Sequence, residues 1–462
     1  MFLKFPTPGE MASPVRALTA AAGRFMPSLR SLRILLLPIL VLAVSVGCSK
    51  HTSHSDDPGM PPAITTGPSD ASTVTGRQVS FTVAATGAVT LRYQWAKDGT
   101  NILGALSSTY TLNNPKVQDS GRYTVTITNP NGTITSAPAT LTVVPAVMFN
   151  APVGLAVDAA GNTYVSDMDD HTIWKVSPTN QKALLAGASG LAGSADGKGS
   201  LARFDTPGGL ALEASGNLLV ADTGNHTIRR IAPDGTVTTV AGAAGQPGST
   251  DGAGTLARFN GPVALAVAGN GSVYVSDSQN HTIRLLATDG TVSTFAGLAG
   301  QPGQTDGALN VAQFNQPNGL ALSPGGALYV ADYGNSSIRL ISPGGTVIVL
   351  AGLYNNHGYV DGTGTAARFY LPVGLALDAS GLLYVADAGN HAIRRVTSTG
   401  TVSVFAGSGT SGNADGAGSA GLFFLPCGVA IAPSGNLVVA DTNNHILRSI
   451  TPAAVVSTYT TP

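Results

Sequence analysis

The chain has 462 residues, of which 11% are charged and 58 are glycine, and its formal net charge is −1. This composition is too apolar for a disordered chain and too rich in glycine for a helical one, so we expect an all-β protein of two or three domains. The balanced charge predicts no nucleic-acid partner. The two cysteines are too few for a disulfide framework.

The N-terminus has the pattern of an export signal. An apolar run from Ile34 to Val46 follows three arginines and ends in small residues. This pattern is typical of a secretory signal, and the run is too short to favour a membrane span. We therefore predict a signal peptide over residues 1–47. A true start at Met26 would give that signal an ordinary length.

The signal ends in the run Ser45-Val46-Gly47-Cys48. This run resembles a bacterial lipobox, in which the cysteine becomes the lipidated first residue, although Ser45 stands where leucine is usual. The resemblance implies lipid attachment at Cys48, a polar tether over residues 48–62, and membrane contact through the acyl chains only. We expect an outer-membrane or cell-surface lipoprotein. The alternative is ordinary cleavage near Ser45, which would leave a periplasmic or secreted protein.

The next segment, residues 63–145, alternates apolar and polar residues. It contains a Tyr-Gln-Trp run ending at Trp95 and an Asp-Ser-Gly-Arg-Tyr run ending at Tyr123. These runs resemble an immunoglobulin-like domain, with Trp95 as the buried tryptophan and Tyr123 as the corner tyrosine. Val83 and Val125 stand where the resemblance places the two cysteines, so apolar packing is expected to replace the disulfide. We expect a spacer, with an adhesive module as the alternative.

From residue 146 onward the chain repeats itself six times. A proline recurs every 54 or 55 residues, and an aspartate follows each proline by fifteen residues. Each unit contains four short strand-like runs separated by turn signals, which is the pattern of a propeller blade. The anchor prolines are Pro152, Pro207, Pro262, Pro317, Pro372 and Pro426, and the aspartates are Asp167, Asp222, Asp277, Asp332, Asp387 and Asp441.

The unit reads P-x-G-L-A, then L-Y-V-A-D-x-x-N-H-x-I-R, and resembles the NHL repeat family over residues 149–462. The resemblance implies a six-bladed β-propeller, so we predict an NHL-type propeller over residues 146–462, preceded by an immunoglobulin-like β-sandwich. We see no clear strand exchange between the termini. We expect the first and last blades to pack edge to edge, helped by residues 143–149.

Two polar columns repeat in the blades, and a structural role explains both of them. The aspartates can accept backbone N–H groups of the turn that follows them. The histidines, replaced in blade four by Ser336, lie far apart around a ring and cannot form one metal cluster. The histidine column is His171, His226, His281, His391 and His445.

The residue after each anchor proline is expected at the mouth of the axial channel. This column is mostly apolar or small, so we expect no catalytic residue, no metal and no cofactor. Related propellers that act as lyases or lactonases hold a metal on the axis, and an exported enzyme of that kind is the alternative. The column is Val153, Gly208, Val263, Asn318, Val373 and Cys427.

A long stretch between the fourth strand and the next anchor repeats an aspartate and, eight residues later, a phenylalanine. Either each phenylalanine packs between blades while each aspartate caps its loop and pairs with a neighbouring arginine, or the loops line one binding rim. We predict a cell-surface binding or scaffold protein whose propeller rim recognises a protein or a glycan. The candidate rim is Asp196, Arg203, Asp251, Arg258, Asp306, Asp361, Arg368 and Asp415.

Overall fold

The computed structural model describes residues 59–75, 78–88, 90–113, 115–144 and 148–459. These residues form β-strands and single 3-10 turns, and no α-helix occurs among them. Within the described ranges no helix is long and apolar enough to cross a membrane. The predicted signal peptide, Cys48 and the tether up to residue 58 lie outside the described residues.

The first ten strands form the predicted immunoglobulin-like fold, as one six-stranded sheet and two strand pairs. Strand β5 pairs antiparallel with β8, β1 with β4, and β2 runs parallel to β10. The elements are β1 (Ala63–Thr66), β2 (Ala71–Val74), β3 (Val79–Thr82), β4 (Ala84–Thr86), β5 (Arg92–Lys97), β6 (Thr100–Asn101), β7 (Thr109–Leu112), the turn η1 (Val117–Asp119), β8 (Gly121–Asn129), β9 (Gly132–Thr135) and β10 (Ala139–Val144).

The core of this domain confirms the predicted replacement of a disulfide by apolar packing. Trp95 and Val125 are fully buried and lie opposite each other in the β5–β8 register. The Tyr110 ring lies between two others, with centroids 6.1 Å from Trp95 and 6.0 Å from Tyr123. Val83 is buried as well. The tryptophan is therefore buried as the sequence predicts, and the tyrosine belongs to the same core.

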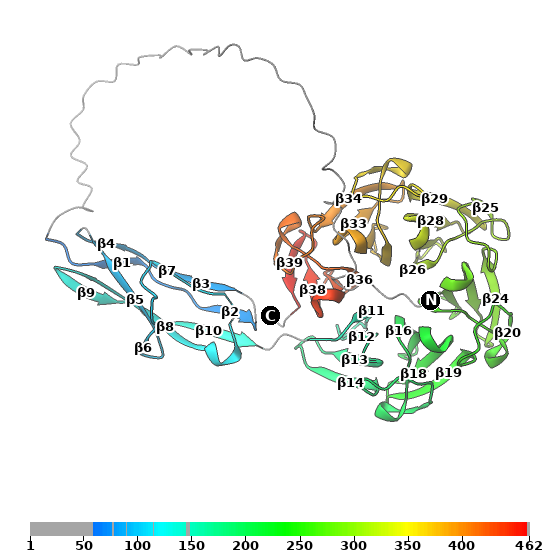
Figure 1. The fold of residues 1–462 in the computed structure, drawn as a ribbon, viewed down its shortest axis with the longest axis horizontal. Helices are drawn as coiled ribbons and strands as arrows, with labels where there is room; N and C mark the ends of the chain where they lie inside the picture. Colours follow the sequence, from blue (N-terminus) through cyan, green and yellow to red (C-terminus); the bar gives the residue numbers. More distant parts are fainter. Residues whose placement is uncertain (1–58, 76–77, 89, 114, 145–147, 460–462) are drawn as a thin grey trace, which may run out of the picture. The chain divides into compact units, whose positions relative to one another are not determined.

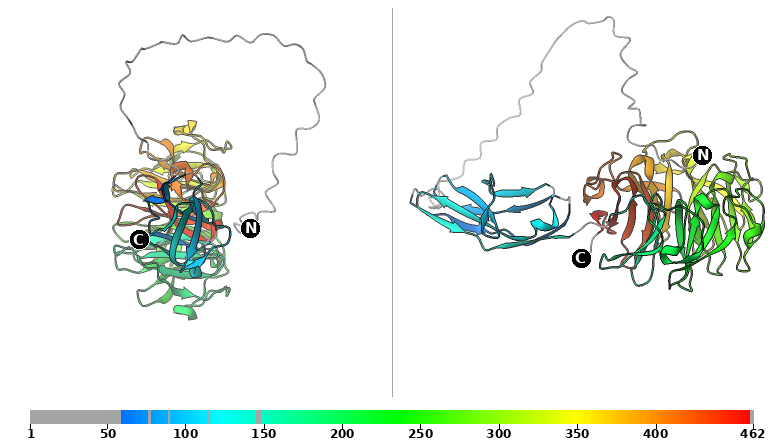
Figure 2. Two further views of the ribbon diagram at one scale, coloured as in Figure 1. Left: turned by 90° about the vertical axis from the view of Figure 1, so that its left-hand side faces the viewer. Right: turned by 60° about the horizontal axis from the view of Figure 1, so that its bottom comes forward.

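The remaining strands form six consecutive sheets, arranged in a ring (Figures 1 and 2). Blade one holds β11 (Pro152–Val157), β12 (Thr163–Asp167), β13 (Thr172–Val176) and β14 (Lys182–Gly187). Blade two holds β15 (Gly197–Lys198), β16 (Pro207–Leu212), β17 (Leu218–Asp222), β18 (Thr227–Ile231) and β19 (Thr236–Gly242). Blade three holds β20 (Gly252–Ala253), β21 (Pro262–Val267), β22 (Val273–Asp277), β23 (Thr282–Leu286) and β24 (Thr291–Ala296).

Blades four to six repeat this plan. Blade four holds β25 (Gly307–Ala308), β26 (Pro317–Leu322), β27 (Leu328–Asp332), β28 (Ser337–Ile341) and β29 (Thr346–Gly352). Blade five holds β30 (Gly362–Thr363), β31 (Pro372–Leu377), β32 (Leu383–Asp387), β33 (Ala392–Val396) and β34 (Thr401–Ala406). Blade six holds β35 (Gly416–Ala417), β36 (Pro426–Ile431), β37 (Leu437–Asp441), β38 (Ile446–Ile450) and β39 (Val455–Thr458).

Short 3-10 turns recur at two places in the blades. One kind follows the blade aspartate: η3 (Thr223–Asn225), η5 (Ser278–Asn280), η6 (Tyr333–Asn335), η8 (Ala388–Asn390) and η10 (Thr442–Asn444). The other kind lies in the long loops: η2 (Gly199–Leu201), η4 (Gly254–Leu256), η7 (Gly364–Ala366) and η9 (Gly418–Ala420).

Each sheet has the four predicted strands in the order of the chain, and blades two to six add a fifth. This outer strand comes from the long loop, as where Gly252 and Ala253 of β20 pair with β24. The loop then contacts the turn at the far end of the blade, since the Gly254 N–H donates to the Gly290 carbonyl at 2.8 Å. The long loops therefore wrap the outer edges of the blades rather than gathering at one end, because the outermost strand offers an unpaired edge.

The ring closes between blade six and blade one. The Thr442 hydroxyl donates to the Pro152 carbonyl at 2.7 Å, and β11 packs against β36. A small strand exchange adds to this packing, contrary to the prediction of none between the termini. Met148 forms a bridge with Ile446 of β38, in the position where other blades use the end of their own fourth strand. Residues 148 and 149 thus complete the outer part of blade six.

The repeated phenylalanines pack between blades, as one of the two predictions for them states. Phe204 is fully buried in a cluster with Ala156 and Ile173 of blade one and Leu210 and Val220 of blade two. Equivalent clusters surround Phe259, Phe314, Phe369 and Phe423. The hydrophobic core of the propeller is therefore a ring of interfaces, each shared by two neighbouring blades.

Candidate functional site

A buried polar cluster in blades two to six is centred on an arginine of the third long strand. In blade three, Arg284 is fully buried and donates to Asp277 Oδ2 at 2.8 Å and to Asp251 Oδ1 at 2.6 Å. Its guanidinium carbon lies 5.3 Å from the centroid of the Phe259 ring. Two carboxylates and an aromatic face thus surround each buried cation. The five arginines are Arg229, Arg284, Arg339, Arg394 and Arg448.

The blade aspartates bind this arginine and the loop before the anchor proline. Asp277 accepts the Asn260 N–H on Oδ1 and the Asn280 side-chain amide on Oδ2, both at 2.7 Å. Burial raises the pKa of Asp277 to about 6, against the attraction of Arg284. The predicted backbone partner in the following turn is therefore wrong. Pro262 pairs with Asp277 across two strands, and this register brings the preceding loop beside the carboxylate.

The aspartates of the candidate rim lie along the outer edges of the blades. Asp251 accepts from Arg284 and from the Thr294 hydroxyl of β24 at 3.1 Å. Arg258, the predicted partner, donates to two carbonyls of its own loop instead. The predicted pairing with the neighbouring arginine is thus wrong, because the buried strand arginine is closer and already desolvated.

The other aspartates and arginines of the candidate rim make the same kinds of contact as Asp251 and Arg258. Arg203 and Arg368 donate to carbonyls of their own loops. The carboxylates of Asp196, Asp251, Asp306 and Asp361 are 46–51% exposed, whereas that of Asp415 is only 6% exposed. Four carboxylates therefore keep a solvent-facing side while they stabilise the blade.

The sequence contains a signal for the strand arginines, and it lies in blade one. Blade one has Trp174 where the other blades have arginine, and no loop aspartate precedes it in the sequence. In the structure, Lys182 supplies the cation there, with Nζ 3.9 Å from the Trp174 ring centroid and 4.1 Å from that of Phe149. The joint loss of arginine and loop aspartate in one blade marks them as partners.

The histidines connect neighbouring blades. His226 accepts the Gly261 N–H of blade three on Nδ1 at 3.0 Å, so its ring is neutral at that nitrogen. Burial lowers the pKa of His226. Equivalent bonds join His171, His281 and His391 to the next blade, and His445 contacts the Asn150 carbonyl of blade one. The repeated polar residues thus stabilise the ring.

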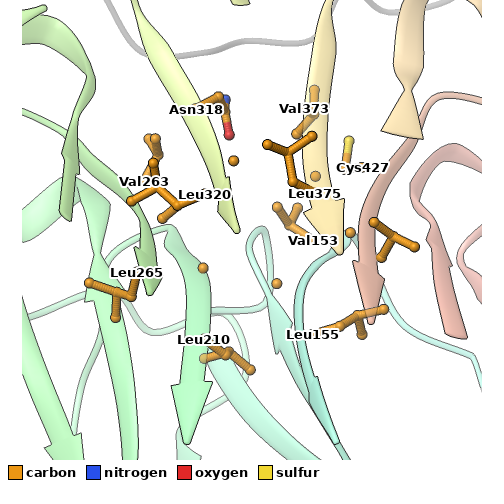
Figure 3. A pocket seen from close by; sticks show the side chains of 17 residues that line it. Val153, Leu155, Leu210, Val263, Leu265, Asn318, Leu320, Val373, Leu375 and Cys427 are labelled. Atoms are coloured by element: carbon orange, nitrogen blue, oxygen red, sulfur yellow. The ribbon is translucent and has the colours of Figure 1, made fainter. Parts of the chain in front are cut away.

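The innermost strands enclose an axial cavity of about 80 Å³ (Figure 3). Five members of the predicted channel column line it, namely Val153, Val263, Asn318, Val373 and Cys427, while blade two contributes Gly209 and Leu210 instead of Gly208. Burial raises the pKa of the Cys427 thiol to about 12, so this cysteine is a core residue rather than a reactive thiol. No group of three His, Cys, Asp or Glu side chains that could hold a metal occurs in the described part of the chain.

One sector of the propeller departs from the repeat. The residue after the blade aspartate is Tyr333 in blade four, and the residue two before the anchor is Tyr370 in blade five. Blades one to three have no ring at either place, and blade six has Phe424 at the second. His357 stacks on Tyr370 with ring centroids 4.6 Å apart. Tyr354 and Tyr370 are 39% and 37% exposed. We call Tyr333, Tyr354, His357 and Tyr370 the aromatic sector.

Comparison with known families matches both parts of the chain. The model of the NHL repeat matches residues 204–231, 314–339 and 369–395. The model of the immunoglobulin domain matches residues 61–129. A solved structure, an auxiliary nutrient binding protein from Bacteroides thetaiotaomicron, has a TM-score of 0.53 and 13% identity, over 88% of this chain and 100% of that one. That likeness shows a shared fold.

Two curated proteins are similar over the propeller. The chloroplastic protein SUPPRESSOR OF QUENCHING 1 of Arabidopsis thaliana is 32% identical over 316 residues, which is 65% of this chain and 30% of that protein. NHL repeat-containing protein 2 of Bos taurus is 31% identical over 337 residues, which is 64% of this chain and 46% of that protein. The chain therefore spans less than half the length of these curated relatives.

Proposed function

For this NHL-repeat protein with an immunoglobulin-like domain, we propose a cell-surface binding or scaffold role, in which the propeller recognises a protein or a glycan. The observation that carries the proposal is the contrast between repeated and unrepeated polar residues. The aspartates, arginines and histidines that recur in the blades are engaged within or between blades, as in the Asp277–Arg284 pair. The exposed rings of the aromatic sector have no such structural explanation.

The aromatic sector lies at the end of the blades where the innermost strands begin, which we call the loop face. Pro372, the first residue of β31, pairs with Asp387, so Tyr370 and the turn after Asp387 share this end. The Asn390 side chain of that turn donates to the Gly358 carbonyl at 2.7 Å, which brings the start of the long loop there too. Exposed aromatic side chains on a rigid scaffold are typical of recognition surfaces.

The partly exposed carboxylates of the outer rim provide a second surface for a larger partner. Asp196, Asp251, Asp306 and Asp361 stand at equivalent places in successive blades. A partner with positive groups at a matching spacing would meet several of them together. In this proposal the lipid on Cys48 anchors the chain and the immunoglobulin-like domain acts as the spacer.

The test uses the full-length protein, labelled and applied to an array that carries purified envelope proteins and polysaccharides of the host cell. We expect saturable binding to at least one spot, retained when the Cys48 lipid is removed by the Cys48→Ser substitution. Metabolic labelling with a radioactive fatty acid should mark the wild type and leave that variant unlabelled. An array without any saturable spot would refute the binding role.

A further inference from the structure

We propose that the loop face binds a sugar ring of a neutral glycan at the junction of blades four and five, beside the aromatic sector. The proposal rests on the binding function above and names its ligand. It depends on three observations at that junction: a missing contact between the blades, exposed rings, and polar groups that lack partners.

The first observation is the missing contact. At the other junctions a histidine contacts the next blade, as where His391 accepts the Leu425 N–H at 3.2 Å. Blade four has Ser336 at this place, in the same left-handed backbone conformation as the histidines. The residue before the anchor proline of the next blade, whose N–H a histidine would accept, is Leu371. The Leu371 N–H has no acceptor among the described residues. The smaller side chain therefore leaves a backbone donor available next to Tyr370.

The second observation is the pair of stacked rings beside this donor. Tyr370 directly precedes Leu371, and His357 lies almost parallel to it, at an interplanar angle of 27°. The backbone of Tyr370 is held in place, because the Tyr370 N–H donates to Asp387 Oδ1 at 2.8 Å and the Tyr370 carbonyl accepts from the Gly389 N–H at 2.9 Å. The exposed ring is thus mounted on a rigid turn and does not lose much entropy on binding a ligand.

The third observation is a group of polar atoms without partners. Asn318 lines the axial cavity and is 8% exposed (Figure 3). Its side-chain amide has no hydrogen-bond partner in the described part of the chain and is not among the fully buried polar atoms, so it is open to the cavity. Asn318 directly follows Pro317, and Pro317 pairs with Asp332 on the next strand. Tyr333 directly follows Asp332, so Asn318 and Tyr333 lie at the same end of blade four. The Tyr333 hydroxyl likewise has no partner among the described residues. Neither group is among the fully buried polar atoms, so both are open to a ligand that offers a hydrogen bond.

Tyr333 lies at the same end of the propeller as Asn318 and Tyr370, because Pro317 pairs with Asp332, Pro372 pairs with Asp387, and β26 packs against β31. Burial raises the pKa of the Tyr333 hydroxyl to about 12, and the Cys427 thiol and the Tyr370 hydroxyl act in the same direction. The Tyr333 hydroxyl therefore stays protonated at neutral pH and can donate as well as accept a hydrogen bond.

Two of the three arginines considered at the junction are already paired with carboxylates. Arg394 is paired with Asp387 at 2.9 Å and with Asp361 at 2.6 Å. Arg368 donates to two carbonyls of its own loop. On the blade-four side, Arg339 is bound to Asp332 at 2.9 Å. Arg394 and Arg339 are therefore unavailable to an anionic ligand. The guanidinium of Arg368 has no carboxylate partner among the described residues, so an anionic sugar is the necessary comparison in the test.

A sugar ring matches these features. Its C–H face can pack on an aromatic ring, and its hydroxyls both donate and accept hydrogen bonds, as the Leu371 N–H, the Asn318 amide and the Tyr333 hydroxyl require. Apolar contact with a few convergent polar groups is also the usual composition of a small-ligand site.

The experiment measures binding of neutral oligosaccharides to the full-length protein by isothermal titration calorimetry. The probes are hexasaccharides of glucose in α- and β-linkage, mannose, xylose and N-acetylglucosamine, with hexagalacturonate as the charged comparison. The variants are Tyr370→Ala, which removes the exposed ring, and Ser336→His, which restores the residue of the repeat. The matched control is Leu201→Ala, an exposed apolar residue on another long loop.

We expect one neutral probe to bind, hexagalacturonate to bind at least tenfold more weakly, and both site variants to lose at least tenfold in affinity. Leu201→Ala should stay within twofold, and melting curves should show all variants folded. If no neutral probe binds the wild type, or if both site variants bind as it does, the inference fails. Saturable binding of an envelope protein on the array, without any glycan, would overturn this inference and leave the proposed function standing.

Discussion

Replacing a buried blade arginine tests whether the carboxylate–arginine network holds the propeller together. Arg284→Met removes the guanidinium from between Asp277 and Asp251 and leaves the fully buried Asp277 without its cation. Breaking a buried ion pair from one side costs about 3–5 kcal/mol. We expect a loss of that size in the free energy of unfolding, measured by urea denaturation with far-ultraviolet circular dichroism at pH 8.

The pH dependence of this loss shows whether it comes from the buried charge of Asp277. Asp277 has a pKa of about 6 in the wild type, raised by burial and opposed by Arg284. Without Arg284 its pKa should rise further above the unfolded value, so the folded variant binds an extra proton between pH 8 and 6. Stability linked to a raised pKa is lost as pH rises, so the variant should recover up to about 1.4 kcal/mol relative to wild type per unit of acidification.

The control is Arg230→Met, which removes a partly exposed arginine bound to Glu213 at 2.8 Å. Such a pair contributes about 0–1 kcal/mol, so this variant should unfold close to the wild type. A loss below about 1 kcal/mol for Arg284→Met, or a loss that does not change between pH 8 and 6, would refute the reasoning about a buried, charge-dependent network.

Three further predictions concern the ring. His226→Ser, which copies the blade-four residue, should lower the free energy of unfolding by about 1 kcal/mol at pH 7.5. Burial lowers the pKa of His226, so the stabilisation by this histidine is complete above the pKa of the unfolded chain and shrinks as pH falls below about 6.5. The urea denaturation curves of the wild type and the variant should therefore converge at pH 5. Gly428→Ala places a Cβ 2.1 Å from the Val153 carbonyl and should lower the melting temperature strongly, whereas Gly269→Ala, with open space around it, should not. Equal melting temperatures would contradict the close packing of blade six on blade one. Cys427 should resist iodoacetamide in the native protein and react after denaturation, as measured by peptide mass spectrometry, because burial raises its pKa to about 12; rapid native labelling would contradict this.

The sequence predicts the propeller well because each blade makes the same internal contacts. Pro262 and Asp277 recur with their spacing since they are paired across neighbouring strands at the same end of the blade. A contact repeated in this way leaves a periodic signal in the chain. The same logic identifies Trp95 and Tyr123 as core residues of the other domain, where both are buried.

The partners of the repeated residues were harder to predict. The fifth strand of blades two to six is only two residues long and has no hydrophobic alternation, so no strand pattern marks it. The loop Asp251 finds Arg284 rather than Arg258 because the loop turns back along the outer strand. Similarly, the exchange at Met148 depends on where β39 stops, which is a property of the closed ring.

By itself, the sequence determined the blade plan, the immunoglobulin-like core and the residues that break the repeat, since periodicity and its exceptions are visible in one dimension. Only the tertiary structure decided what those exceptions do together. Ser336 and Tyr370 belong to different blades, and the histidine contact that Ser336 lacks normally spans 34 or 35 residues. Their meeting at one junction is decided by how neighbouring blades pack side by side, because interblade contacts depend on ring geometry rather than on local chain pattern.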